Sequence, residues 1–82
     1  MNNKHENTKV TISSKIRRRA YIDHCFIVVL DTKLVLHYDC DLETFYKICS
    51  DLDTASKWKW TFNKSTHKLI SWKPIDYTCC IQ

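Results

Sequence analysis

The sequence predicts an α+β domain in which one amphipathic helix packs on one face of a small antiparallel sheet, in the order β-β-β-α-β-β. Three observations carry this prediction. Short segments near both ends alternate apolar and polar residues with the period of a β-strand. A central segment spaces its apolar residues three and four apart, as a helix does. The chain has 82 residues, 44% of them hydrophobic, which is enough for one core and too few for two.

We expect residues 1–7 to be a disordered tail, residues 8–76 to form the domain and residues 77–82 to be a C-terminal tail.

The first half of the chain predicts three strands. Residues 9–13 alternate and form the first strand, which residues 15–22 can continue. Residues 25–30 and 33–38 are rich in β-branched side chains and predict a hairpin.

A two-residue turn at Asp31 and Thr32 sets the expected register of that hairpin. One face is then wholly apolar, with the pairs Val29–Leu34, Ile27–Leu36 and Cys25–Tyr38. The other face carries His24, Phe26, Val28, Val35 and His37. Because both faces are substantially hydrophobic, the hairpin is expected at the centre of its sheet.

Residues 41–52 predict the helix. Asp41 suits the N-cap, and Glu43 lies in the first turn, where the helix dipole favours acidic side chains. The apolar residues form one stripe that can dock on the sheet: Leu42, Phe45, Cys49 and Leu52.

The most distinctive segment is a pair of strands that interleave aromatic residues with lysines. Residues 57–62 read Lys-Trp-Lys-Trp-Thr-Phe and residues 68–73 read Lys-Leu-Ile-Ser-Trp-Lys. A three-residue loop at residues 64–66 would gather Trp58, Trp60 and Trp72 on one face, with Trp60 opposite Ile70, whereas a two-residue loop would divide them. We prefer the first, because a small domain needs this face as a core wall. The alternatives are a base-stacking platform and aromatic anchors for a protein partner.

The net charge of +4 conceals three segregated blocks. Residues 1–22 carry +5, residues 23–55 carry −5 and residues 56–82 carry +4. Either opposite blocks meet in the fold or each block forms its own patch. The candidate contacts for a partner or for nucleic acid are the basic residues of the outer blocks: Lys15, Arg17, Arg18, Arg19, Lys57, Lys59, Lys64, Lys68 and Lys73.

The absence of glycine excludes several classes of site. Phosphate-binding loops, dinucleotide fingerprints and nucleophile elbows all need glycine for tight turns or close backbone approach. A catalytic site would have to use His24, His37 and Cys40, and no known catalytic motif includes them. We therefore expect no catalytic residues and no cofactor.

A metal site is not expected either. In the predicted hairpin His24 and His37 lie diagonally on one face, while Cys25 points to the other. The paired short spacings that mark a structural zinc site are missing.

The five cysteines and the polar first dozen residues predict free thiols in a reducing, cytoplasmic setting. The longest apolar run, residues 26–30, is far too short to span a membrane. The last four residues, Cys79, Cys80, Ile81 and Gln82, match the pattern for prenylation, without the usual basic residues beside it.

Size and composition are typical of the small charged accessory proteins of viruses and mobile elements. We expect a non-catalytic binding protein, an inhibitor that occupies a host nucleic-acid-handling complex through its basic surfaces. Its partner is then a protein or a protein–nucleic-acid complex. The alternative is direct binding of RNA or single-stranded nucleic acid by the Lys/Trp hairpin together with Arg17, Arg18 and Arg19.

Overall fold

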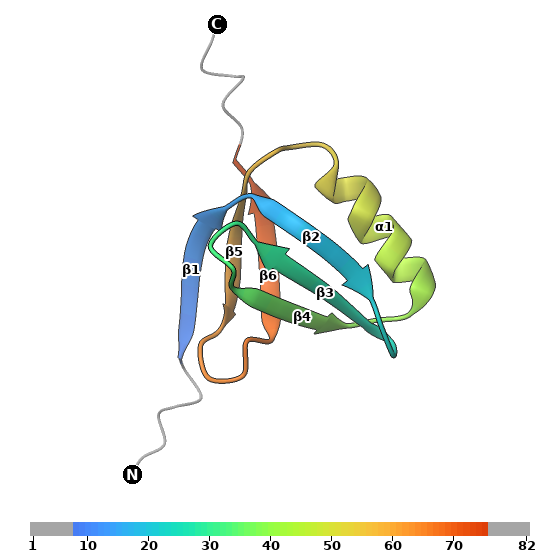
Figure 1. The fold of residues 1–82 in the computed structure, drawn as a ribbon, viewed down its shortest axis with the longest axis horizontal. Coiled ribbons are helices and arrows are strands. Elements are labelled where there is room, and N and C mark those ends of the chain that lie inside the picture. Colours follow the sequence, from blue (N-terminus) through green and yellow to red (C-terminus); the bar gives the residue numbers. More distant parts are fainter. Residues whose placement is uncertain (1–7, 76–82) are drawn as a thin grey trace, which may run out of the picture.

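The computed structural model describes residues 8–75 and confirms the α+β class (Figure 1). Four strands rather than three precede the helix, because a break at Lys15 divides the first predicted segment. The strands form two antiparallel sheets, ordered β1-β5-β6 and β2-β3-β4, instead of one. The elements are β1 (Lys9–Ser14), β2 (Ile16–Tyr21), β3 (Cys25–Leu30), β4 (Val35–Asp39), α1 (Leu42–Leu52), β5 (Trp58–Asn63) and β6 (Leu69–Pro74).

Strand β5 is the centre of the first sheet, and its neighbours come from the two ends of the described chain. Ile12 of β1 lies opposite Trp60 on one side, and Trp72 of β6 lies opposite it on the other. The inward-facing residues of β5, Trp58, Trp60 and Phe62, are all buried. The interpretation of this aromatic strand as a core wall is therefore confirmed.

The β5–β6 register differs from the predicted one by two residues. The side-chain oxygen of Asn63 accepts hydrogen bonds from the N–H groups of Ser65 and Thr66 at 2.8 and 3.0 Å, which shapes a longer loop. A bulge follows, so that Trp60 lies opposite Trp72 rather than Ile70. A shift of two residues preserves the faces of a strand, so the tryptophans still lie together. Ile70, expected among them, is exposed.

Strand β3 is the centre of the second sheet, as expected, but its pairing with β4 is shifted by one residue. Lys33 adopts φ 75°, and its N–H donates to the Leu30 carbonyl at 2.8 Å. The turn therefore has three residues rather than two, with the last in the left-handed region. Val29 lies opposite Val35, not Leu34.

The one-residue shift changes which side chains of β3 and β4 share a face. The face that enters the core carries Phe26, Val28, Leu30, Leu36 and Tyr38. The outward face carries Cys25, Ile27 and Val29 of β3 together with His37 of β4. The predicted register was wrong at this hairpin.

Two corners hold the sheets together around the core. Where β1 passes into β2, the buried Ser14 hydroxyl donates to the Asp31 carboxylate, and Trp60 Nε1 donates to the Ser14 carbonyl at 3.2 Å. At the other corner, the His37 N–H donates to the His67 carbonyl at 3.2 Å, which links β4 to the start of β6. Apolar side chains from both sheets and the helix fill the space between them.

The helix begins where the sequence predicts and runs alongside β2 (Figure 1). The Thr44 N–H donates to Asp41 Oδ1 at 2.9 Å, and hydrogen bonds from Thr44 hold the pKa of Asp41 below its ordinary value. The buried stripe is rotated from the predicted one: Ile48 and Leu52 are buried, whereas Leu42 is 48% exposed. This helix, the one that the described residues form, is neither long enough nor apolar enough to cross a membrane.

Candidate functional site

The outer face of the β1-β5-β6 sheet is predominantly polar and basic. Its alternating residues form cross-strand rows, one of Ser13, Lys59 and Lys73 and the next of Thr11, Thr61 and Ser71. Lys9 continues the face at the start of β1, beside Asn63. We call this surface the cationic sheet face; it consists of Lys9, Thr11, Ser13, Lys59, Thr61, Ser71 and Lys73.

The cationic sheet face contains no acidic side chain. Lys59 and Lys73 lie directly opposite each other on neighbouring strands. Like charges in that position destabilise a sheet, and no ion pair within residues 8–75 neutralises either of them. The hydroxyl groups are close together too, with Thr11 Oγ1 and Thr61 Oγ1 at 2.8 Å. An arrangement that costs stability in this way is suited to an anionic ligand.

The tryptophans lie on the opposite side of the same sheet. Trp58 and Trp60 are 1% and 0% exposed, so neither offers a ring face to a base or to a partner. Trp72 is half-buried and meets Tyr38 edge to face, with ring centroids 5.4 Å apart. The stacking platform and the aromatic anchors therefore have no accessible ring at Trp58 or Trp60.

The arginine run is divided among different surroundings. Arg17 is the extra residue of a bulge in β2 and is exposed. Arg18 lies opposite Val29, and Arg19 opposite Val28. The Arg19 guanidinium reaches the end of the helix and pairs with Asp53 at 2.7 Å. The three arginines thus do not form one flat contact surface.

The remaining predicted basic residues are scattered around the first sheet. Lys15 lies exposed at the corner between β1 and β2, Lys57 precedes β5, and Lys64 lies in the β5–β6 loop. Lys68 pairs with Asp39 at 3.4 Å. Of the nine basic residues predicted from sequence, only Lys59 and Lys73 belong to the cationic sheet face.

Sequence reasoning missed Lys9 and the hydroxyl residues of this face. Alternation in residues 9–13 showed that Lys9, Thr11 and Ser13 share a side of their strand. The pairing of β1 with β5, about 50 positions away, was not predicted, and that pairing brings these residues beside Lys59.

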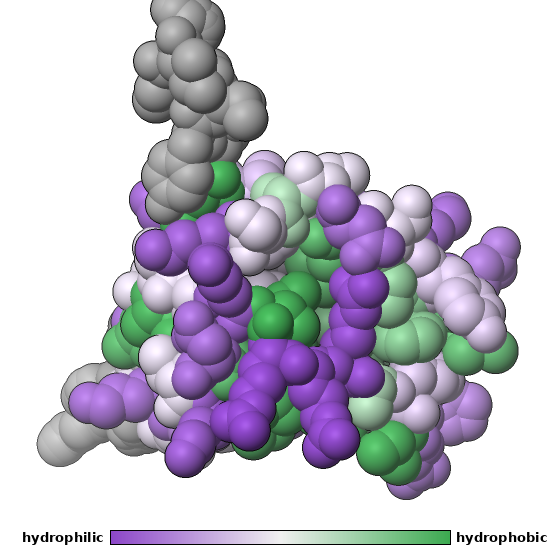
Figure 2. Space-filling model, turned by 45° about the horizontal axis from the view of Figure 1, so that its top comes forward, coloured by the Kyte–Doolittle hydropathy of each residue, from purple (hydrophilic) through white to green (hydrophobic). Residues whose placement is uncertain are grey.

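The outer face of the β2-β3-β4 sheet has the opposite character. A shallow hollow of about 320 Å³ there is lined by Arg18, Arg19, Ala20, Ile22, Ile27 and Val29. Figure 2 shows hydrophilic side chains bordering an apolar centre on this side of the molecule. We call Ala20, Ile22, Ile27, Val29 and Val35 the apolar sheet face.

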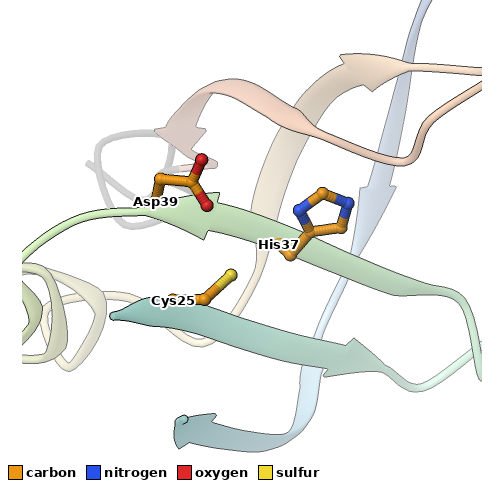
Figure 3. A group of neighbouring side chains, drawn as sticks. All are labelled: Cys25, His37 and Asp39. Atoms are coloured by element: carbon orange, nitrogen blue, oxygen red, sulfur yellow. The ribbon is translucent and has the colours of Figure 1, made fainter. Parts of the chain in front are cut away.

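One chemical cluster lies at the edge of the apolar sheet face and was not predicted. Cys25, His37 and Asp39 point toward one another from β3 and β4 (Figure 3). The sequence signal was present, but the two-residue turn that we predicted placed Cys25 on the other side of the hairpin from His37. His24 and Cys40, which were also considered from the sequence, are not part of the cluster.

Comparison of the chain with protein-family models, with curated proteins and with solved structures found no match. The functional argument therefore rests on the surfaces described above.

Proposed function

We propose that this chain is a small non-catalytic binding protein whose cationic sheet face binds the phosphate backbone of a nucleic acid. It would act by occupancy, as an accessory protein that inhibits a nucleic-acid-handling complex by covering its substrate. The observation that carries the proposal is the pair Lys59 and Lys73, directly opposed on a sheet face without a single acid.

The chemistry of the cationic sheet face suits phosphates rather than bases. Lysines supply mobile positive charges, and serine and threonine hydroxyls donate hydrogen bonds to phosphate oxygens. No aromatic side chain belongs to this face, so base stacking contributes nothing there. We therefore expect binding that depends weakly on sequence and strongly on salt.

The three thiols within residues 8–75 are consistent with a role without catalysis. Burial is the main cause that raises the pKa of Cys25, Cys40 and Cys49 above the ordinary value of a thiol. A nucleophilic cysteine needs the reverse shift, because the thiolate is the reactive form.

A salt titration with matched charge variants tests the proposal. Binding of the full chain to labelled single-stranded and duplex RNA would be measured by fluorescence anisotropy at several salt concentrations. The slope of log K against log salt is negative, and we expect it to become shallower in Lys59→Gln/Lys73→Gln. For the single strand its magnitude should fall by about 1.4, at roughly 0.7 for each lost phosphate contact.

The control removes the same charge from another part of the molecule. Lys33→Gln/Lys47→Gln changes the β3–β4 turn and the exposed side of the helix, so it should leave the slope nearly unchanged. Equal losses in both double variants would mean that net charge alone drives binding. Absence of binding by the unmodified chain at low salt would refute the proposal and favour a protein partner.

A further inference from the structure

Strands β3 and β4 bring together three side chains that are typical metal ligands. Cys25 lies directly opposite Asp39, and His37 is two residues before Asp39, on the same face of β4. One potential ligand atom from each lies within 4.8 Å of the other two. Cys25 and His37 are half-buried, and Asp39 is exposed, so the cluster is open to solvent on one side.

The orientation of His37 leaves one ring nitrogen for the cluster. Nε2 lies 3.0 Å from the carbonyl oxygen of Thr66. Since a carbonyl can only accept, Nε2 carries the proton of the neutral ring and Nδ1 keeps a free lone pair. Figure 3 shows one ring nitrogen on the side of Asp39 and the other directed away. A backbone carbonyl that fixes a histidine in this way is a common feature of metal sites.

We propose that Cys25, His37 and Asp39 bind one Zn²⁺ ion, with an open fourth position for water or for a group from a partner. A thiolate, an imidazole and a carboxylate form a mixed donor set that favours zinc over magnesium or calcium. Tetrahedral zinc would place these atoms about 3.5 Å apart, so side-chain movements of about 1 Å are sufficient. Binding replaces the thiol proton of Cys25 with the metal and releases that proton to solvent.

Two neighbouring features bear on the site. Asp39 Oδ2 faces Lys68 Nζ at 3.4 Å, and the carboxylate retains a second oxygen for the ion. Cys25 is half-buried, which disfavours a free thiolate, whereas a coordinated divalent cation stabilises the thiolate directly.

Metal titration of the reduced full chain tests the proposal. Zn²⁺ would be titrated in competition with a chromophoric chelator, and Co²⁺ would be added separately as a spectroscopic probe. We expect one ion per chain, a thiolate-to-cobalt charge-transfer band and a thermal midpoint that rises with zinc concentration. Cys25→Ser should weaken zinc binding by more than about 100-fold, since losing only a second-shell partner already costs 10- to 100-fold.

Matched variants separate this site from the other thiols. Cys49→Ser, which alters a half-buried helix thiol, should bind zinc as the unmodified chain does. Cys79→Ser/Cys80→Ser, outside the described residues, should do the same. Asp39→Asn keeps the side-chain shape and should weaken binding with the far-UV spectrum unchanged.

Three outcomes would overturn the proposal: no stoichiometric zinc binding, binding that survives Cys25→Ser, or binding lost in Cys79→Ser/Cys80→Ser. The zinc site and nucleic-acid binding are independent, because their residues lie on different sheets. Anisotropy titrations in the presence of a chelator would therefore measure nucleic-acid binding while the zinc site is empty.

Discussion

Four described residues adopt left-handed backbone conformations although the chain has no glycine. They are Asp23, His24, Lys33 and His67, with φ between 56° and 75°. Asp23 and His24 form a two-residue turn between β2 and β3, which requires positive φ at both positions. Lys33 and His67 lie in the turns that precede β4 and β6. A side chain with a Cβ atom is strained in this region, so these turns cost stability that glycine would not.

Lys33→Gly should therefore stabilise the protein. Relief of the left-handed strain exceeds the entropy that glycine loses on folding, and we expect a gain of roughly 0.5–1 kcal/mol in the free energy of unfolding. Thr32→Gly is the control one position earlier, where φ is not positive, and should lower stability by about 0.5–1 kcal/mol. Urea unfolding followed by tryptophan fluorescence measures both. Equal destabilisation by the two changes would contradict the turn described for β3–β4.

The turns also explain what sequence reasoning could and could not recover at this scale. Glycine usually marks the left-handed position of a three-residue hairpin loop, and here Lys33 occupies it without any sequence signal. Asp41, by contrast, was predicted correctly as N-cap, because capping depends on a local side chain and a nearby N–H group.

The elements themselves were predictable because periodicity is local. The strands around Val28 and Trp60 and the helix from Leu42 appear at their expected places. The register between strands was not, because a change of one residue in turn length alters which side chains of the two strands share a face. The observed register at β3–β4 places Cys25 on the face of His37, whereas the predicted register separated them, so the metal cluster was not predicted. At β5–β6 the shift of two residues left the tryptophans on the predicted face.

Two neighbouring valines test which face of β3 enters the core. Val28 is completely buried, whereas Val29 lies on the outer face beside Val35. Val28→Ala should lower the free energy of unfolding by about 2 kcal/mol, from lost burial and the cavity left behind. Val29→Ala should change it by less than about 1 kcal/mol. Urea unfolding measures both variants, and a larger loss of stability in Val29→Ala than in Val28→Ala would contradict the orientation described for β3.

At the scale of the whole molecule, the fold divides the first basic block of the sequence between two sheets. This block supplies β1 and β2, and the second basic block supplies β5 and β6. Because β1, β5 and β6 form one sheet, part of the first block joins the second in the cationic sheet face, whereas β2 with its three arginines pairs with β3. The acidic block supplies β3, β4 and the helix. The sequence left two outcomes open, that opposite blocks meet in the fold or that each block forms its own patch. Both occur in part, since the ion pairs Arg19–Asp53 and Lys68–Asp39 join opposite blocks.

Those two ion pairs do little to stabilise the fold. Their side chains are 31% to 70% exposed, and exposed pairs contribute at most about 1 kcal/mol each. Stability comes instead from the aromatic and aliphatic core between the sheets. Within residues 8–75, Lys59 and Lys73 form no ion pair, and we propose that they serve binding rather than folding.

Amide chemical-shift mapping tests this central claim most directly. The isotopically labelled full chain would be titrated with a short unlabelled RNA in buffer containing a chelator, at low salt. The account predicts the largest shifts at Lys9, Lys59, Lys73 and their strand neighbours, with the apolar sheet face nearly unchanged. Shifts concentrated at Ala20, Ile27 and Val29, or none at all, would contradict it.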